Sequence, residues 1–317
     1  MATAESLTPA TVALSVVVVA HDMARELPRT LRTLSVPYQR AIDSAAFEVI
    51  VVDNGSREPL VVPPSVEERV RVHRIEQASP SPALAANVGI DMARGALIGL
   101  VVDGARMASP GLLATALRGD AAAARAVVTA PAWHLGRERQ SGGSGHNQAL
   151  EDELLAGAGW EADGYRLFGI ATPAGSSARG LFGAMGESSS LFLRRELWQE
   201  LGGLDERFAL PGGGMVNHDL YRRACQLADA QLVVLLGEGT FHQVHGGAAT
   251  SGRLSRGEMR ADYEAICGAP HRPPGNRPLF VGTVSPDYLP HVTASVALAQ
   301  GAAGGSGPEG QVGSSSA

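Results

Sequence analysis

The feature that most constrains the fold is a series of three apolar runs rich in β-branched residues. They span residues 12–19, 47–53 and 96–103, and each has the length of one strand. Continuous runs of this kind are typical of strands buried on both faces of a parallel sheet. With 317 residues, of which 44% are hydrophobic, the chain is long enough to bury a full core around such a sheet.

Segments with helical features lie between these runs. Leucines recur at helical spacing over residues 23–34, where Pro28 is compatible only with the first turn of a helix. A short strand is expected at 71–75, and then a helix over 82–94 with Gly95 as its C-cap. Repeated strand–helix–strand units predict an α/β fold, with a Rossmann-like, mostly parallel sheet flanked by helices.

The second half of the chain alternates loops with further elements. Glycine and serine are frequent in residues 136–145 and 171–183, which we expect to form mobile loops. A strand at 188–193 should turn directly into a helix that ends at Gly202, with Trp198 in the core. A further helix is expected to begin near Asn217 as its N-cap, followed by a strand that leads into a histidine-containing loop.

Charge and cysteine content exclude several classes of protein. The net charge of −6, with all 26 basic residues being arginine, argues against an extended nucleic-acid-binding surface. Cys225 and Cys267 are too few for a disulfide framework or a thiolate metal site. Residues 1–11 lack the features of a secretory signal, and the longest apolar runs are too short to span a membrane. We therefore expect a cytoplasmic protein with no integral membrane span and no nucleic-acid partner.

Acidic residues close two of the apolar runs. Asp53 ends the second run, immediately before the turn-forming residues Asn54-Gly55-Ser56, and Asp103 ends the third. Ligands of open parallel sheets bind outside the carboxyl ends of the strands. Both carboxylates are therefore expected to stand beside a ligand, although a simple strand-end turn is an alternative role for Asp103.

Three longer segments resemble the family 2 glycosyltransferases, which have the GT-A fold. The segments are LSVVVVAHDMARELPRTLRTL, VVDNGS and ALAANVGIDMARGALIGLVVDGA, and the resemblance runs from about Leu14 to Gly247. It implies a hexosyltransferase that uses a nucleoside-diphosphate sugar as donor. The positions that match the family's donor site, or lie beside it, are Ala20, His21, Asp22, Asp53, Asn87, Asp103 and Gly104.

The resemblance also implies a divalent cation, Mn²⁺ or Mg²⁺, at Asp103. Ala105 stands where many members of the family carry the second carboxylate of an Asp-x-Asp motif. A histidine from a late loop completes the site in related enzymes, and His245 matches it, with His242 as the weaker candidate. A loop histidine that bonds the backbone is the alternative for His245. Arg106 and Arg179 are candidates for phosphate contacts.

A further matching segment contains the sequence NHDLYRRA, in which Asp219 matches the family's general base. This assignment implies inversion at the anomeric carbon. The alternative is that Asp219 only stabilises the first turn of its helix. Glu187, His218 and Gly213 are candidates for contacts with the acceptor, which we expect to be a sugar or small glycoside.

The resemblance suggests a division of the chain into parts. These are a flexible N-terminus (1–11), a GT-A domain (12–250) with a donor half (12–110) and an acceptor half (111–250), a C-terminal appendage (251–300) and a disordered tail (301–317). The Pro/Arg-rich stretch at 268–280 could be a packing arm for a partner subunit, so a homo-oligomer is one alternative.

Several other functions remain open from the sequence. UDP-glucose and GDP-mannose are the leading donors. A nucleotidyltransferase would share the sheet, but the first strand is not followed by the Gly-rich phosphate loop that such an enzyme carries. A retaining transferase would need no base at Asp219. A catalytically weak or dead nucleotide-sugar-binding module is suggested by Ala105 and His218, which replace acidic residues of the family.

Overall fold

The structure is a computed structural model that describes residues 12–136, 146–247 and 254–304. The predicted flexible N-terminus, most of the predicted loop at 136–145 and the tail beyond residue 304 lie outside the described residues. Residues 301–304, expected to be part of a disordered tail, form the last turn of a helix.

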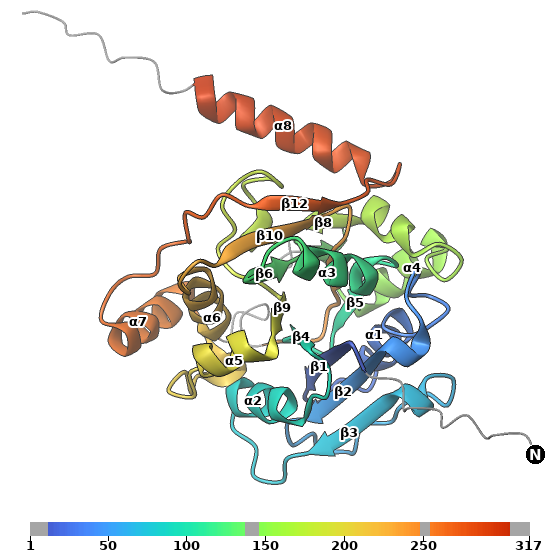
Figure 1. Cartoon of the computed structure of the whole chain (residues 1–317). Coiled ribbons are helices and arrows are strands. Elements are labelled where there is room, and N and C mark those ends of the chain that lie inside the picture. The colour runs from blue at the N-terminus through green and yellow to red at the C-terminus, as the bar shows by residue number, and fades with distance from the viewer. Residues whose placement is uncertain (1–11, 137–145, 248–253, 305–317) are drawn as a thin grey trace, which may run out of the picture.

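An eight-stranded sheet forms the centre of the molecule (Figure 1). Its strand order is β12-β10-β6-β9-β4-β1-β2-β3. The strands are β1 (Leu14–Ala20), β2 (Phe47–Asp53), β3 (Val70–Arg74), β4 (Leu97–Val101), β6 (Ala126–Thr129), β9 (Ser190–Arg194), β10 (Gln231–Leu236) and β12 (Leu279–Gly282). All neighbours pair in parallel except β9, which runs antiparallel to both β4 and β6. The expected mostly parallel α/β sheet is confirmed.

A smaller sheet lies beside the first and has the order β5-β11-β7-β8. Its strands are β5 (Arg106–Ala108), β7 (Ala132–Leu135), β8 (Ala171–Pro173) and β11 (Thr240–His242). β8 falls in a segment that we expected to be a mobile loop. It is instead held by antiparallel pairing with β7, in which Trp133 is opposite Pro173.

Helices cover both faces of the main sheet (Figure 1). The α-helices are α1 (Leu27–Thr33), α2 (Ala83–Met92), α3 (Leu112–Ala121), α4 (Gln148–Ala158), α5 (Arg195–Leu201), α6 (Val216–Cys225), α7 (Arg256–Cys267) and α8 (Leu289–Gly304). Short 3₁₀ turns occur at Ser44–Ala46, Glu67–Arg69, Gly164–Ile170, Gly175–Ser177 and Pro211–Gly213.

Successive side chains of β1 point to opposite faces of the sheet and pack in two separate layers of the core. Val17 and Val19 pack in one cluster with residues of α2, α5 and α6, whereas Val16 and Val18 pack in a second cluster with residues of α1 and α3. Trp198 belongs to the first cluster and donates a 3.0 Å hydrogen bond from Nε1 to the carbonyl oxygen of Ile98, as its predicted core position requires.

Gly95 has a different role from the predicted C-cap. α2 ends earlier, with Ala93 as its cap in an extended conformation. A Cβ atom on Gly95 would lie 2.5 Å from the backbone nitrogen of Ser15. Gly95 is therefore needed because the chain passes close to the start of β1. Asn217 is likewise not an N-cap: it lies inside the first turn of α6, whose N-cap residue is Met215.

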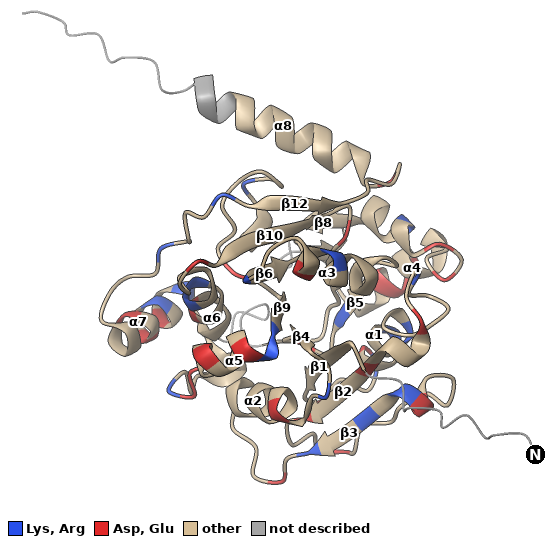
Figure 2. Ribbon diagram, in the orientation of Figure 1, with Lys and Arg blue, Asp and Glu red and all other residues tan. Residues whose placement is uncertain are grey.

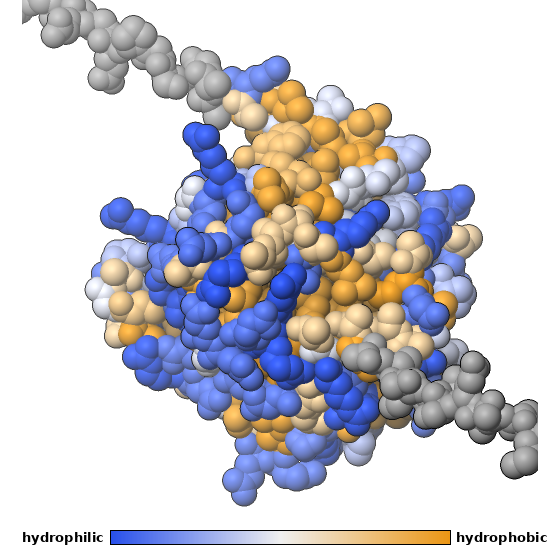
Figure 3. All heavy atoms as spheres, viewed as in Figure 1, coloured by the Kyte–Doolittle hydropathy of each residue, from blue (hydrophilic) through white to orange (hydrophobic). Residues whose placement is uncertain are grey.

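The segment predicted as a C-terminal appendage is part of the main domain. β12 is the edge strand of the large sheet, and Tyr263 of α7 is buried in the core. The first turns of α8 pack against the body, where the N–H of Leu181 donates to Oγ of Ser295 at 3.0 Å, and α8 carries no charged side chain among its described residues (Figure 2). Apolar side chains gather around β12 and the start of α8 (Figure 3), where Leu279 and Leu289 are 43% and 55% exposed. None of the described helices has both the length and the hydropathy needed to cross a bilayer.

Candidate active site

Three turns meet at the carboxyl edge of the main sheet. The N–H of Asn54, after β2, donates to the carbonyl oxygen of Ala20 at 2.8 Å, and the N–H of Gly104, after β4, donates to that of Val19 at 2.7 Å. A Cβ atom on Gly104 would lie 2.8 Å from the Cβ of Ala20, so only glycine fits at this approach. The ends of β1, β2 and β4 therefore form one continuous surface, as the parallel arrangement predicts.

The turn after β4 fixes Asp103 and explains the missing second carboxylate. Oδ1 of Asp103 accepts a 2.9 Å hydrogen bond from the N–H of Ala105. The carbonyl oxygen of Ala105 in turn accepts a 2.8 Å hydrogen bond from the N–H of Gln243. Ala105 itself is fully buried. An acidic side chain at this position would point into the core, so a second ligand has to come from elsewhere.

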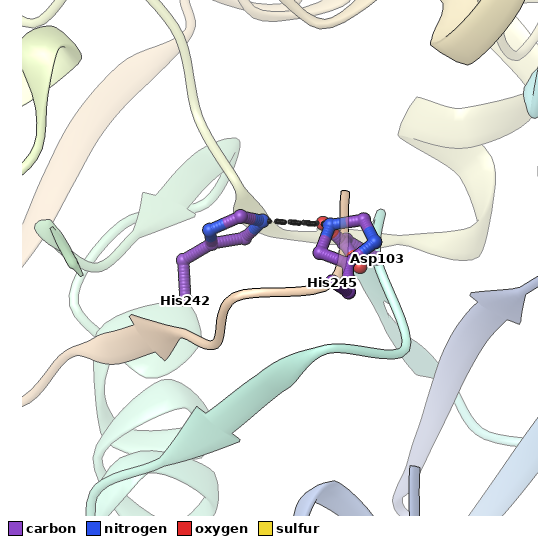
Figure 4. Close-up of side chains that lie close together, drawn as sticks. All are labelled: Asp103, His242 and His245. Carbon is purple, nitrogen blue, oxygen red and sulfur yellow. Dashed lines mark hydrogen bonds and ion pairs between the residues drawn. The ribbon is translucent and has the colours of Figure 1, made fainter. Parts of the chain in front are cut away.

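Two histidines lie where they can supply the second ligand. β11 brings His242 beside Asp103, and the following loop brings His245 to the same point (Figure 4). Nε2 of His242 and Nε2 of His245 lie 3.0 and 3.2 Å from Oδ2 of Asp103, and 3.0 Å from each other. The predicted pair of Asp103 and His245 is thus brought together. His242, the weaker candidate, is an equal member of the group, which we call the metal triad.

Burial and charge shift the pKa of all three groups. Burial alone would raise the pKa of Asp103, but the imidazoles of His245 and His242 outweigh it and hold that pKa well below its usual range. Burial lowers the pKa of His242 to about 4 despite its hydrogen bond to Asp103. Burial acts in the same direction on His245, but the carboxylate of Asp103 raises the pKa of His245 overall. The two imidazoles therefore favour the charged form of the Asp103 carboxylate.

The triad fits a divalent cation. Adjacent ligands of an octahedral ion with bonds of about 2.1 Å are separated by about 3.0 Å. The three ligand atoms have separations of 3.0 to 3.2 Å, so they can occupy one face of such an ion. Two histidines and one carboxylate on a face leave the remaining positions open for a ligand or water. The three side chains therefore have the chemistry and the spacing to hold a divalent cation.

Hydrogen bonds from two helices hold the loop that carries the histidines. Nε2 of Gln243 donates to the carbonyl oxygen of Glu26, before α1, at 3.2 Å. The N–H of Val244 donates to Oε2 of Glu151 on α4 at 2.8 Å. Arg25 joins the two sides, because it donates to the carboxylates of both Glu26 and Glu151. These residues are not identifiable from the sequence, because no motif links helix α4 to the distant histidine loop.

An arginine side chain lies next to the metal triad. Arg106 is opposite His242 in the pairing of β5 with β11. Its Nε and Nη1 atoms are buried and have no hydrogen-bond partner among the residues that the structure describes. A buried guanidinium without a partner is costly unless an anion completes its hydrogen bonds. Arg106 is therefore positioned to bind an anionic ligand.

The predicted donor residues after β1 and β2 lie at this edge, but not all of them are exposed. Nδ1 of His21 donates a 3.0 Å hydrogen bond to the carbonyl oxygen of Asn54, and its side chain is 56% exposed. Asp22 pairs with Arg57, whose backbone N–H lowers the pKa of Asp22. Both can reach a ligand at the carboxyl edge.

Asp53 is placed beneath the surface. Its side chain is 2% exposed, Oδ1 accepts from the N–H of Ser56 at 2.8 Å, and Oδ2 accepts from Nη1 of Arg74 at 2.8 Å. The carboxylate therefore shapes the turn after β2. The structure corrects the expectation of a direct donor contact, because both oxygens face protein donors.

The expected donor contact of Asn87 is also corrected. Its side chain donates to the carbonyl oxygen of Leu204 at 3.0 Å and accepts from the N–H of Leu204 at 2.8 Å. It also donates to Glu206. These bonds use the amide to hold the turn after α5 against α2, so Asn87 stabilises packing instead of contacting a donor.

Asp219 is held by two arginines. Oδ1 accepts from Nη2 of Arg222 at 2.9 Å, and Oδ2 accepts from Nε of Arg223 at 2.6 Å. The side chain is 3% exposed, and Arg223 also donates to the carbonyl oxygens of Leu201 and Gly203. A general base must present a free oxygen to its substrate. In this conformation Asp219 instead joins α6 to the end of α5.

The predicted acceptor residues divide into two groups. Nδ1 of His218 lies 3.4 Å from Oε2 of Glu187, and both side chains are 28% exposed. Gly213 is buried, and a Cβ atom there would lie 2.7 Å from Val216 and 2.9 Å from Pro82. Gly213 therefore serves packing at the start of α6, whereas His218 and Glu187 form a pair that a ligand can reach.

Comparisons with known proteins identify the architecture. No protein-family model matches the chain, and no curated protein matches it in sequence. Solved structures that resemble it include S. aureus TarS 1-349, with a TM-score of 0.50, 17% identity, and coverage of 73% of this chain and 60% of that one. The complex of TarS 1-349 with UDP-GlcNAc has a TM-score of 0.52 and 15% identity, over 81% of this chain and 67% of that one.

A second solved protein resembles nearly the whole chain. The mannosyltransferase PcManGT from Pyrobaculum calidifontis, in complex with GDP-Man and Mn²⁺, has a TM-score of 0.50 and 16% identity, over 93% of this chain and 76% of that one. This chain spans 60% of the length of TarS 1-349, the first of these structures. The similarities establish that the chain has the GT-A fold, which confirms the fold implied by the three matching segments.

Proposed function

We propose that the protein is a metal-assisted glycosyltransferase that moves a hexose from a nucleoside-diphosphate sugar to a hydroxyl group of a sugar or small glycoside. The observation that carries this proposal is the metal triad of Asp103, His242 and His245, which lies at the carboxyl edge of a GT-A sheet. TarS and PcManGT, which share the fold, bind UDP-GlcNAc and GDP-Man respectively.

The chemistry of the triad fits the departure of a diphosphate. A bound cation would neutralise the negative charge that develops on the leaving diphosphate. Asp103 and the two histidines would hold it, and their arrangement on one face leaves room for phosphate oxygens. Arg106 adds a second positive group, because its buried Nε and Nη1 atoms lack partners among the described residues. We assign to Arg106 the role of binding the donor phosphates.

The ligand set favours Mn²⁺ over Mg²⁺. Mg²⁺ prefers oxygen ligands, whereas imidazole nitrogen suits transition metals. Two of the three ligand atoms here are imidazole nitrogens. The Mn²⁺ in the PcManGT complex is consistent with this preference but belongs to that protein.

The nucleoside is expected to bind along the turns after β1 and β2. His21 and Asp22 are exposed there, and Asp53 holds the second turn in shape from below. UDP-glucose and GDP-mannose remain the leading donors. A retaining transferase on the same fold, or a binding module that does not turn over its donor, are the alternatives.

The proposal is tested by donor binding and turnover in one set of samples. Wild-type protein, His242→Ala and His245→Ala are screened by thermal shift with UDP-glucose and GDP-mannose, each with Mn²⁺ or EDTA. We expect one donor to raise the melting temperature of the wild type only with Mn²⁺, and Mn²⁺-dependent release of nucleoside diphosphate from that donor. Both triad variants should lose these responses, whereas a His73→Ala control on the exposed side of β3 should keep them.

The outcomes separate the alternatives. Donor binding without any release of nucleoside diphosphate would favour a binding module. Transfer that retains the anomeric configuration, determined by NMR of the product, would favour the retaining mechanism. No stabilisation of the wild type by any nucleotide or nucleotide sugar would overturn the proposed function.

A further inference from the structure

The pair formed by His218 and Glu187 lies apart from the metal triad and has its own chemistry. We propose that His218 is the general base that takes the proton from the acceptor hydroxyl, that Glu187 stabilises the charge it gains, and that the acceptor is a polyhydroxylated compound. This inference rests on the proposed function and names the residue that activates its nucleophile.

The geometry of the pair leaves one ring nitrogen for the substrate. Nδ1 of His218 lies 3.4 Å from Oε2 of Glu187. Nδ1 of His218 makes no hydrogen bond with a described residue, so its contact with Glu187 is electrostatic, and in the tautomer with Nδ1–H the lone pair of Nε2 can accept a proton. Both side chains are 28% exposed, so a ligand can reach them. A histidine with a carboxylate beside it has the groups that a general base requires.

The sheet places this pair at the same edge as the metal triad. β9 runs antiparallel to β4, with Ser190 opposite Val101, so the start of β9 lies beside the end of β4. Asp103 follows Val101 by two residues, and Glu187 precedes Ser190 by three. The hydroxyls of Ser189 and Thr240 also lie 3.3 Å apart, which connects the same segment to the start of β11 and thus to His242.

Buried polar atoms near His218 lack partners. They are Nδ1 of His218 itself, Oδ1 of Asn217, Oδ2 of Asp262 and Nε2 of His271, none of which has a hydrogen-bond partner in the described part of the chain. The rings of His218 and His271 have centroids 5.0 Å apart. Buried polar groups are nearly always satisfied in folded proteins, so these atoms indicate a ligand that brings several donors and acceptors. A sugar with adjacent hydroxyls fits this requirement better than an alcohol with one hydroxyl.

The neighbouring Asp219 does not compete for this role. Its two oxygens accept hydrogen bonds from Arg222 and Arg223, and its side chain is 3% exposed. His218 precedes it in the first turn of α6 and is open to a ligand. His218 is therefore the side chain that can exchange a proton with the acceptor, and Asp219 is not.

The proposed reaction is a single displacement at the anomeric carbon. The lone pair of His218 Nε2 takes the proton of the acceptor hydroxyl as its oxygen forms a bond to the anomeric carbon. The bond from that carbon to the diphosphate oxygen breaks, and its electron pair leaves with the nucleoside diphosphate. Glu187 faces the imidazolium that results, and Arg106 lies on the diphosphate side. The product has the inverted configuration.

The test compares His218→Ala with Glu187→Gln and a His73→Ala control. The donor is whichever of UDP-glucose and GDP-mannose the wild type uses with Mn²⁺, and methyl glucoside and methyl mannoside are the acceptor probes. We expect kcat of His218→Ala to fall by about 10²-fold or more, with donor affinity unchanged. Added imidazole should restore part of the rate in His218→Ala alone, because a free base can occupy the vacated position. Glu187→Gln should show a smaller loss, and His73→Ala none.

The result distinguishes two failures. If the wild type turns over its donor and His218→Ala keeps the wild-type kcat, or loses activity that imidazole does not restore, His218 is not the base and the proposed function stands. If the wild type binds and turns over no donor, the proposed function is wrong and the base assignment falls with it.

Discussion

The backbone N–H of Val244 donates a 2.8 Å hydrogen bond to Oε2 of Glu151, a carboxylate that is fully buried in helix α4. Val244 lies directly before His245, so this bond ties a residue of the metal triad to an element about a hundred residues away in the chain. Burial raises the pKa of Glu151, although Arg25 and the Val244 N–H oppose this effect. Supporting contacts of this kind set the orientation of metal ligands.

Replacement of Glu151 is therefore expected to weaken metal binding. Glu151→Ala should lower the affinity for Mn²⁺ by about 10- to 100-fold, measured by isothermal titration calorimetry, while the fold is retained. Asp152→Asn is the matched control, because Asp152 lies next on the same helix, also pairs with Arg25 and is 48% exposed. Equal Mn²⁺ affinity in both variants would show that the loop does not depend on Glu151.

Restoring the second acidic residue of the motif should not improve the site. Ala105 is fully buried, and its backbone already bonds to Asp103 and Gln243. An Ala105→Asp substitution would place a carboxylate in the core, and we expect a loss of about 3 kcal/mol or more in the free energy of unfolding. Chemical denaturation measures this loss. A variant with wild-type stability and tighter Mn²⁺ binding would contradict the burial argument.

Arg106 offers a test in which stability and binding change in opposite directions. Its buried, unpartnered Nε and Nη1 atoms carry a desolvation cost in the free protein. Arg106→Met should keep or raise the melting temperature without ligand, yet reduce the stabilisation by nucleoside diphosphate with Mn²⁺. Arg69→Met, at an exposed position before β3, serves as the control. A nucleotide response equal to that of wild type would remove Arg106 from the phosphate site.

His271 should make stability depend on pH. Burial, with the nearby charges of His218 and Arg222, lowers its pKa to about 4, whereas Glu187 and Asp219 oppose this shift. The unfolded chain has a histidine pKa of about 6.5, so between these values only the unfolded state is protonated. The contribution of His271 to the free energy of unfolding is therefore complete above pH 6.5 and falls as the pH drops toward 4.

The substitution His271→Asn isolates this contribution. The variant should lose less stability than the wild type when the pH is lowered from 7.5 to 5, measured by urea denaturation at each pH. Parallel curves for the two proteins over this range would show that His271 titrates normally in the folded state.

Two glycines give a paired test of the packing. A Cβ atom on Gly99 of β4 would lie 2.4 Å from the ring of Phe192 on β9, whereas one on Gly157 of α4 meets nothing within 4 Å. Gly99→Ala should destabilise the protein by about 1 to 3 kcal/mol. Gly157→Ala should stabilise it by about 0.5 to 1 kcal/mol, because alanine favours the helix. If both variants unfolded at the same temperature as the wild type, both predictions would be contradicted.

The sequence predicted the strands well because they are continuous and apolar. The run at residues 47–53 matches β2 residue for residue, and Pro28 lies in the first turn of α1 as required. The predictions failed where tertiary contacts decide the outcome. Gly95 satisfies a close approach to β1 and not a helix cap, and 171–173 is a strand because β7 is there to pair with it.

The candidate site was predictable where a residue lies at a strand end. Asp103 and His245 were expected, and His242 was underrated because strand position alone does not reveal the direction of its ring. Asp53, Asn87 and Asp219 were assigned from matching motifs, but their contacts are with the protein itself. A motif identifies a position in the chain, whereas the partners of its side chain depend on packing that the motif does not record.

The antiparallel strand β9 has a consequence for how the chain can become a folded protein. It inserts between β4 and β6, although it follows β6 by about sixty residues. During synthesis, β4 and β6 are both complete while the strand that joins them is still missing, and their inner edges remain unpaired. The sheet closes only after residue 194 has left the ribosome. A break near residue 110 would therefore yield two fragments that must assemble with each other, not two independent domains.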